Sequence, residues 1–242
     1  MRHRRFVLPI VLVLGLLAGC DSAATPGPLP RAAELAAKSA RSLRALDSVQ
    51  FRFSVNGTIP GFPVRSAGGV ARTSGWAKGT VDLQHGLGHT EYQFTLNGGT
   101  VRLTGGDGPP STRPVPQEFT PADLLNSDSG IRLLLRRATS LRTETTETMH
   151  GTPTFRVTGK LDKATLSAIV PGVWADAVVK FWIGKAPQHA LHRIWVQLPP
   201  RQPNAGVVAL QLALSKHNAV TKPSSSVSTS SGPSRQPSGS PG

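Results

Sequence analysis

Residues that could carry out chemistry are few in this chain, and they stand in pairs rather than in clusters. His85 and His89 lie four residues apart in HGLGH, a spacing that would suit two ligands of one metal ion on a helix. The two glycines of that stretch favour a hairpin turn, so a solvated turn is the better interpretation. Glu144 and Glu147 share the run TETTET, where a solvated strand face explains them better than a catalytic carboxylate pair.

Other signatures of catalysis are missing from the sequence. It contains no Gly-x-Ser-x-Gly elbow, no His-Glu-x-x-His and no phosphate-binding Gly-x-x-x-x-Gly-Lys-Ser/Thr. His189 and His192 have no nearby Cys, Asp or Glu in the sequence that would complete a metal site. The 4 tryptophans could stack on sugars, although scattered tryptophans are more typical of sheet packing. We therefore expect no enzyme, no catalytic residue, no metal and no cofactor.

The single cysteine, Cys20, has surroundings that predict a covalent modification. Three arginines near the start precede the apolar run Phe6–Leu17, which is too short for a membrane-spanning helix of roughly 20 residues. Leu17-Ala18-Gly19-Cys20 matches the lipobox of bacterial lipoproteins, in which the cysteine thiol carries a diacylglycerol and the chain is cut just before it. We therefore expect a signal peptide at residues 1–19 and lipidation of Cys20. The alternative is ordinary secretion with a buried free cysteine.

Acylation of Cys20 would set the location of the protein. Two or more acyl chains give a stable anchor, so we expect a protein held at the cell membrane on its extracytoplasmic face, with the cell wall or partial release as alternatives. The formal net charge of +14 suits anionic lipid headgroups or acidic polysaccharide, and export argues against nucleic acid. With 1 cysteine that is acylated, the fold must rely on a hydrophobic core rather than on disulfides.

Composition divides the remainder of the chain into three parts. Residues 20–30 are small, polar and Pro-rich and predict a flexible tether behind the lipid. Residues 221–242 are rich in Ser, Pro and Gly without apolar periodicity and predict a disordered tail. The folded domain is expected at residues 31–220.

Three helices are expected in that domain. The first is the Ala-rich stretch 31–48, in which Leu35, Ser39, Leu43 and Leu46 recur at helical spacing. The second lies within 119–141, where Thr120 and Asp123 resemble a capping box. Its apolar stripe would be Ile131, Leu134, Leu135, Ala138 and Leu141, with Arg132, Arg136 and Arg137 pointing elsewhere. The third is 162–170, capped by Asp162 and stopped by Pro171.

Strands are predicted by alternation of apolar and polar residues. The clearest is 49–59, and further runs lie at 76–84, 90–96, 100–104, 143–149, 154–158, 177–183, 191–198 and 207–215. Asn97-Gly98-Gly99 between two of these runs predicts a hairpin. Short turns between successive strands favour a single antiparallel meander over parallel βαβ units.

The inward side chains of this sheet form a large apolar set. They are Phe51, Phe53, Val55, Val81, Leu83, Tyr92, Phe94, Leu96, Val101, Leu103, Phe155, Val157, Phe181, Ile183, Ile194, Val196, Leu210 and Leu212. A sheet with helices on one face normally encloses a filled core. Periodicity alone leaves open whether these residues fill the space or line a cavity, and on residue physics alone the filled core is favoured.

Several stretches carry a family likeness. They are SVNGTIPG (54–61), AKGTVDL (77–83), LLNSDSGI (124–131), GTPTFRVTGKLDKATLSAI (151–169) and LALSKHNAVTKP (212–223), in this order behind a lipobox. Together they resemble the mycobacterial and actinobacterial LppX/LprA/LprF/LprG lipoprotein family, most closely its LprG-like members, over almost the whole domain.

The resemblance implies an α+β fold of the kind seen in LppX and in carriers such as LolA. A strongly curved antiparallel half-barrel sheet, with helices covering its concave face, would enclose an apolar pocket for acyl chains of envelope lipids. The ligands implied are triacylated glycolipids, such as phosphatidylinositol mannosides and lipoarabinomannan, or triacylglycerol. The inward set, with Leu134 and Leu135, then becomes pocket lining. Val81 matches a family valine near the pocket mouth, and a major facilitator efflux transporter is the implied protein partner.

The sequence departs from the family at three places. The loop 105–119 lacks a tryptophan of the relatives, His217 replaces another, and 199–204 is Pro-rich where the relatives are Gly-rich. These changes affect the expected ligand and opening more than the fold. The alternative function is a surface lipoprotein without cargo, whose basic face binds envelope glycan or a membrane protein.

Overall fold

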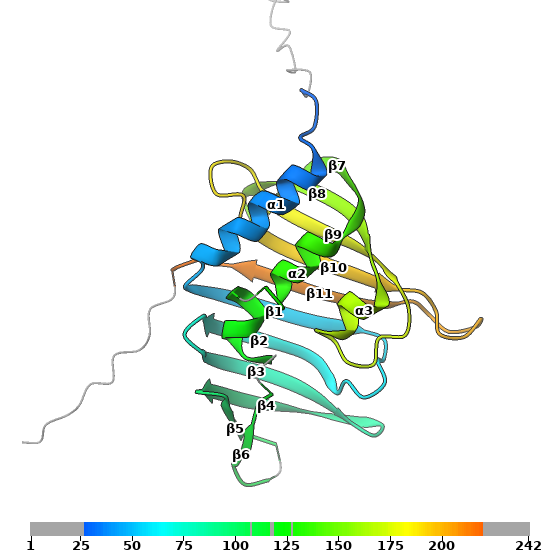
Figure 1. Ribbon diagram of the computed structural model, residues 1–242. Coiled ribbons are helices and arrows are strands. Elements are labelled where there is room, and N and C mark those ends of the chain that lie inside the picture. Colours follow the sequence, from blue (N-terminus) through cyan, green and yellow to red (C-terminus); the bar gives the residue numbers. More distant parts are fainter. Residues whose placement is uncertain (1–26, 107, 117–118, 127, 220–242) are drawn as a thin grey trace, which may run out of the picture.

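The structure, a computed structural model, describes residues 27–106, 108–116, 119–126 and 128–219. These residues form an antiparallel sheet of 11 strands in the order β6-β5-β4-β3-β2-β1-β11-β10-β9-β8-β7 (Figure 1). The strands are β1 (Ser48–Asn56), β2 (Val64–Arg72), β3 (Trp76–His85), β4 (Gly88–Asn97), β5 (Thr100–Thr104), β6 (Ser111–Pro114), β7 (Thr139–Met149), β8 (Thr152–Leu161), β9 (Ala177–Gly184), β10 (Leu191–Leu198) and β11 (Val208–Ser215). The predicted signal peptide, Cys20, the tail 221–242 and most of the tether lie outside the described residues.

The strand order shows how the chain builds this sheet. Strands β1 to β6 lie side by side in sequence order, and the chain then crosses to the far edge. Strands β7 to β11 return from that edge until β11 pairs with β1 in the middle. The topology is thus two meanders joined by a crossover, rather than the single meander predicted. The sheet is open, because β6 and β7 do not pair with each other in the described chain.

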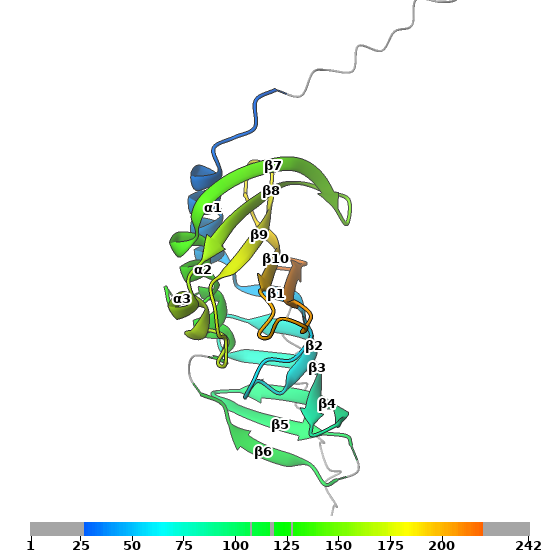
Figure 2. The same cartoon turned by 90° about the vertical axis from the view of Figure 1, so that its right-hand side faces the viewer.

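The helices lie together on one face of the sheet (Figures 1 and 2). Helix α1 (Ala32–Ser42) continues into the 3-10 turn η1 (Leu43–Ala45), and α3 (Lys163–Ser167) follows β8. The crossover contains the π-helical turn η3 (Ala122–Asn126) and helix α2 (Ile131–Arg137). This arrangement is the predicted half-barrel with helices on one side. Among the described residues, none of the helices has the length and apolar character needed to cross a bilayer.

The first helix was predicted in the right place but too long. Leu35, Ser39 and Leu43 are buried, as their helical spacing predicted. Beyond its last turn the chain is held by the side chain of Asn218, which lies far away in sequence. The Asn218 side chain accepts a hydrogen bond from the Asp47 N–H at 2.8 Å and donates one to the Ala45 carbonyl at 3.0 Å. No local pattern could have indicated this contact.

Helix α3 confirms the predicted cap. The Asp162 carboxylate accepts hydrogen bonds from the Thr165 N–H at 2.7 Å and the Thr165 hydroxyl at 2.9 Å. These bonds favour the charged carboxylate and lower the pKa of Asp162, the backbone bond most of all. The helix is shorter than predicted: it ends at Ser167, and turns follow up to Gly172.

The crossover corrects the predicted second helix. The Thr120 hydroxyl accepts a hydrogen bond from the Asp123 N–H at 3.4 Å, as in the predicted capping box. The segment then divides into η3 and α2, and α2 stops at Arg137. Leu141 therefore lies on β7 and not on the predicted helical stripe.

Two strands were missed by the sequence analysis, β2 and β6. Strand β2 reads VRSAGGVAR, and its inward residues Ala67, Gly69 and Ala71 are too small to display alternation. Strand β6 has only 4 residues and includes a proline, which is typical of an edge strand. The predicted hairpin at Asn97 is confirmed, with positive φ angles of 57° at Gly98 and 80° at Gly99.

Candidate functional site

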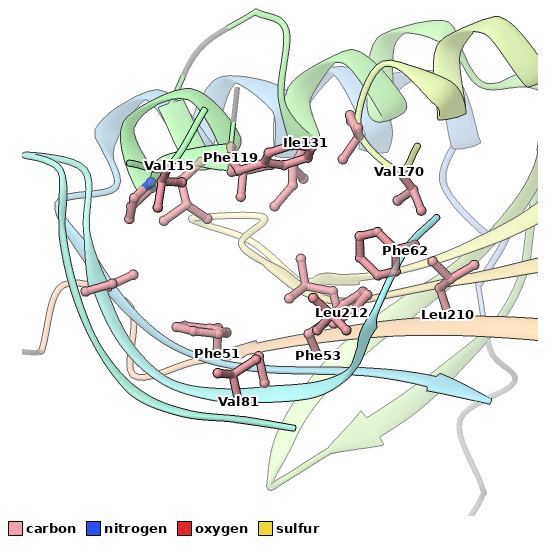
Figure 3. A pocket seen from close by; sticks show the side chains of 18 of the residues that line it. Phe51, Phe53, Phe62, Val81, Val115, Phe119, Ile131, Val170, Leu210 and Leu212 are labelled. Carbon is pink, nitrogen blue, oxygen red and sulfur yellow. The ribbon is translucent and has the colours of Figure 1, made fainter. Parts of the chain in front are cut away.

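An apolar cavity of about 590 Å³ lies between the helices and the sheet (Figure 3). Its floor is made by inward side chains of β1–β5, β10 and β11. Its roof is made by the crossover, from Val115 to Leu134, and by the segment from Leu166 to Val173. A volume of this size lies within the range of about 300–1,000 Å³ found for ligand pockets.

The structure brings most of the predicted lipid-binding residues together around this cavity. Those that line it are Phe51, Phe53, Val81, Leu83, Phe94, Leu96, Val101, Leu103, Leu134, Ile194, Val196, Leu210 and Leu212. They come from six strands and from α2, and Figure 3 shows Phe51, Phe53, Val81 and Leu212 on the floor. Contact with lipid remains a prediction for each of them.

Seven predicted residues lie outside the cavity lining: Val55, Tyr92, Leu135, Phe155, Val157, Phe181 and Ile183. Val157, Phe181 and Ile183 are 0% exposed, because α1 packs against β7 and β9 and fills the space above this part of the sheet. Leu135 is buried within the core that α1 and α2 share. Val55 and Phe155 pack against the edge of the core, and the Tyr92 ring contacts His85.

Apart from Leu134, the residues of the cavity roof were not predicted to bind lipid. Val115, Phe119, Leu124, Leu125 and Ile131 line it from the crossover. Leu166, Ile169, Val170 and Val173 line it from α3 and the chain that follows, and Phe62 does so from the β1–β2 loop. The available signal was the presence of isolated apolar residues in connecting segments, which usually carry polar residues. Helical spacing marked Ile131 as apolar but did not place it at a cavity, and periodicity does not register apolar residues that belong to no strand or long helix.

The lining determines what the cavity can hold. All of its residues are aliphatic or aromatic hydrocarbons, glycine or proline. A charged or hydrogen-bonding group inside would lose its water without gaining a partner, which costs several kcal/mol. The cavity therefore suits hydrocarbon and excludes a polar headgroup.

The opening of the cavity lies at one end of the sheet, which we call the mouth end. The solvent-exposed members of the lining are Gly61, Pro63 and Pro171. Gly61 and Pro63 belong to the β1–β2 loop, and Pro171 lies between α3 and β9. At this end β1 and β10 finish and β2, β9 and β11 begin. A ligand that enters here can keep its polar part outside.

Arg132 was predicted to point away from the apolar stripe of its helix, and the structure buries it beside α1. Its side chain is 6% exposed and binds Asp128 at 2.8 Å, and its Nε–H donates to the Ala40 carbonyl at 3.0 Å. Burial lowers the pKa of Arg132, and the positive charge of Arg44 adds to this. Arg132 therefore ties α2 to the last turn of α1. Neither it nor the exposed Arg136 and Arg137 belongs to the cavity lining.

Replacing Arg132 tests this link between α2 and α1. We expect Arg132→Leu to lower the free energy of unfolding by about 1–3 kcal/mol, because the Ala40 carbonyl and Asp128 lose a charged donor. Arg136→Leu removes an exposed partner of the same Asp128 and should change it by less than about 0.5 kcal/mol. Urea denaturation of both variants measures the difference. Equal losses would contradict a structural role for Arg132.

Histidines gather at the end of the sheet opposite the mouth. The rings of His192 and His217 meet edge to face at 5.2 Å, and the His217 Nε2–H donates to the Leu191 carbonyl at 2.9 Å. Burial lowers the pKa of both residues, and the pKa of His192 falls further beside His217 and His150. Within the described residues, no three His, Cys, Asp or Glu side chains are grouped so that they could hold a metal ion.

These lowered pKa values predict a pH-dependent stability. The unfolded chain binds protons at His192 and His217 near pH 6.5, whereas the folded chain resists them. Their stabilising contribution is present above about pH 6.5 and is lost as the pH falls through the lowered folded pKa. Between pH 7.5 and pH 5.0 the melting temperature should therefore fall by more in the unaltered chain than in the double variant His192→Gln/His217→Gln. Equal falls would contradict this prediction.

The paired histidines and the paired glutamates make structural contacts. His85 ends β3 and His89 lies on β4, on either side of a tight turn, and His89 contacts Asp82 at 2.9 Å. Glu144 binds Arg156 at 2.7 Å, and Glu147 binds Arg156 and accepts a hydrogen bond from the Trp182 indole at 2.7 Å. The glutamates thus form a partly buried ionic network rather than the freely solvated strand face expected.

Comparison with known proteins agrees with this architecture. The family model for the LppX_LprAFG lipoproteins matches residues 31–221. The lipoarabinomannan carrier protein LprG of Mycobacterium tuberculosis is 30% identical over 234 residues, covering 92% of this chain and 97% of that protein.

Solved structures show the same fold. The crystal structure of LprF from Mycobacterium bovis aligns with a TM-score of 0.68 at 19% identity, covering 81% of this chain and 96% of that one. The crystal structure of Mycobacterium tuberculosis lipoprotein LppX aligns with a TM-score of 0.60 at 22% identity, covering 78% and 96%.

Proposed function

Because the chain belongs to the LppX_LprAFG lipoprotein family, we propose that it is a lipid carrier of the cell envelope, which binds acyl chains in its cavity and takes them toward the outer envelope. The observation that carries this proposal is the apolar cavity of about 590 Å³, open at one end and lined by hydrocarbon. The cargo class is the acyl chains of triacylated glycolipids or triacylglycerol, since a relative is named a lipoarabinomannan carrier.

The physical basis of carriage is the hydrophobic effect. Each methylene that leaves water for an apolar site contributes about 0.8 kcal/mol, so a chain of about 16 carbons gains on the order of 12 kcal/mol before ordering costs. Such binding discriminates only weakly between acyl chains of different length and bulk, and it needs no covalent bond to form or break. The headgroup stays beside Gly61, Pro63 and Pro171, where the lining meets solvent.

Cys20 completes the proposal as an anchor separate from the cargo site. An acylated Cys20 would hold the protein at the extracytoplasmic face of the plasma membrane, with residues 21–30 as the tether. A Cys20→Ala protein should then lose its membrane anchor and keep its cargo. A major facilitator efflux transporter remains a predicted partner on the strength of the family resemblance.

The rival function is a surface lipoprotein that binds envelope glycan or a membrane protein through its basic face. That function does not require a cavity, and it predicts a filled core. The cavity favours the carrier, since a void of this size lined by leucine, valine and phenylalanine leaves their contacts unmade unless a ligand supplies them.

Native mass spectrometry of the non-acylated protein tests the carrier directly. We expect a Cys20→Ala chain to purify with bound lipid, or to take up lipid from an envelope extract, at about one molecule per chain. The bound lipid, once extracted and fragmented, identifies the cargo. A chain that carries nothing and takes up nothing from the extract would contradict the proposal.

A further inference from the structure

We propose that the mouth end of the molecule docks onto a phospholipid membrane surface, with Leu87 at the point of contact. This inference rests on the proposed function, because it assumes that acyl chains enter the cavity. Among the connections that strand pairing places at this end are the turn 86–87 after β3, the loop 57–63 after β1 and the loop 199–207 after β10. Figure 2 looks onto this end of the sheet.

Leu87 is the most exposed large apolar side chain at this end, with a relative exposure of 106%. His85 pairs with Gly88, so Gly86 and Leu87 alone form the tip of the hairpin. Gly86 has a positive φ of 58°, which a glycine adopts without strain. Leu87 therefore contributes no burial to the fold, and the hairpin holds it out into solvent.

One exposed leucine is ordinary on a protein surface, but the distribution of such residues is not even. The exposed large hydrophobic side chains among the described residues are Leu29, Leu87, Val178 and Val207. Leu87, Val178 and Val207 all belong to the mouth end, where β9 and β11 begin. The turns at the opposite end, 73–75, 98–99 and 150–151, contribute none of this class in the described chain.

The exposed apolar residues also flank the opening. In the sheet order, the β3–β4 turn with Leu87 lies on one side of the β1–β2 loop, and the β10–β11 loop with Val207 lies on the other. Neighbouring strands are about 4.8 Å apart, so each flank lies within roughly 15 Å of the loop that carries Gly61 and Pro63. Pro199 and Pro200 extend the exposed apolar rim.

This geometry fits a lipid surface better than a protein. The exposed side chains stand on separate loops and form no continuous face of the kind that a protein interface buries. Separate apolar tips can each enter the boundary between headgroups and acyl chains. A membrane at this end would place the opening against the leaflet, so that an acyl chain reaches Phe62 and the cavity without crossing water.

A single-site fluorescent probe tests the docking. Because Cys20 is the only cysteine, Cys20→Ala leaves none, and Leu87→Cys then provides one labelling position. The chain is produced from residue 20, after the apolar segment 1–19, and all of its described helices and strands lie beyond that point. An environment-sensitive dye at position 87 should shift to the blue when vesicles of phosphatidylglycerol and phosphatidylcholine are added.

The matched control is the exposed Ser74 in the β2–β3 turn at the opposite end. A dye on Ser74→Cys should show no shift with the same vesicles. No shift at position 87, or equal shifts at both positions, would overturn the docking proposal. A shift that disappears without phosphatidylcholine or without phosphatidylglycerol would still support it and define the lipid required.

A second measurement separates docking from cargo binding. Leu87→Ser should slow the uptake of lipid from vesicles about fivefold or more, and should leave loading from detergent-solubilised lipid unchanged, since Leu87 does not line the cavity. If both the unaltered chain and Leu87→Ser load lipid from detergent and take it up from vesicles at the same rate, the docking proposal alone is overturned. No loading from detergent in the unaltered chain would overturn the carrier function and the docking with it.

Discussion

A Val81→Trp chain should stay folded and lose at least about nine-tenths of its bound lipid, a tenfold effect that corresponds to about 1.4 kcal/mol. Val81 lies on β3 and forms part of the cavity floor beside Phe51 (Figure 3). An indole at this position occupies space that the proposed acyl chain would need. In a filled core such a substitution costs about 1–3 kcal/mol of stability through overpacking, but here the ring has room to turn into the hollow. Native mass spectrometry gives the loading, and thermal unfolding checks the fold.

The matched control is Thr80→Trp, one residue earlier on the same strand. Adjacent residues on a strand point to opposite faces, and Thr80 is exposed on the face away from the cavity. This variant adds nearly the same bulk outside and should load lipid like the unaltered chain. Equal loading of the Val81 and Thr80 variants would exclude the cavity floor as the lipid site. Unfolding of the Val81 variant alone would show that the space beside Phe51 is already filled.

Alternation of residues was enough to predict much of the sheet, because one face of every strand is covered. In β1, Val49, Phe51 and Phe53 face the helices, and Gln50 and Arg52 face away. The order of the strands could not be read in the same way. Nothing local in the sequence indicates that Phe53 pairs with Leu212, across most of the chain, or that the crossover reaches the far edge.

The cavity was beyond the reach of periodicity for a related reason. Phe94 on β4 and Phe181 on β9 both take inward positions of predicted strands, although Trp182 interrupts the alternation on β9. Phe94 lines the cavity, whereas Phe181 is 0% exposed in filled core because α1 packs over β9. Which strand a helix covers is decided by contacts between distant segments, such as Asn218 with Ala45. The family resemblance supplied the expectation of a cavity that residue patterns could not.

Strand β2, one of the two that alternation missed, also has the small residues that make room for the cavity. On β2 the inward side chains Ala67 and Ala71 line the cavity, as does Ala77 opposite on β3. Large residues at these positions would have revealed the strand and would also have filled the hollow. The small volume of these inward residues thus has two effects. It removes the apolar alternation that would have predicted β2, and it leaves space between the sheet and the helices.

Gly69→Ala should be among the most destabilising single substitutions in this domain, lowering the free energy of unfolding by about 3 kcal/mol. Gly69 on β2 pairs directly with Gly79 on β3. A Cβ on Gly69 would lie 2.8 Å from the Gly79 Cα and closer still to the Lys78 carbonyl oxygen. A Cβ atom essentially never comes within 3.0 Å of a heavy atom outside its own and the adjacent residues, so the backbones of these strands approach unusually closely at this pair. Such convergence is what a sheet that curves toward its helices requires.

The adjacent Gly68→Ala separates this close approach from the general effect of glycine in a strand. Gly68 faces outward, and the nearest atom to its added Cβ is the Phe51 carbonyl oxygen at an ordinary 3.7 Å. Alanine there reduces the freedom of the unfolded chain by the same amount as at Gly69, so it should be neutral or stabilise by about 0.4–1 kcal/mol. Guanidinium denaturation of the two variants measures the difference. Similar changes in both would mean that backbone freedom governs β2, whereas a large loss at Gly69 alone would show that its contact with Gly79 holds the curvature on which the cavity depends.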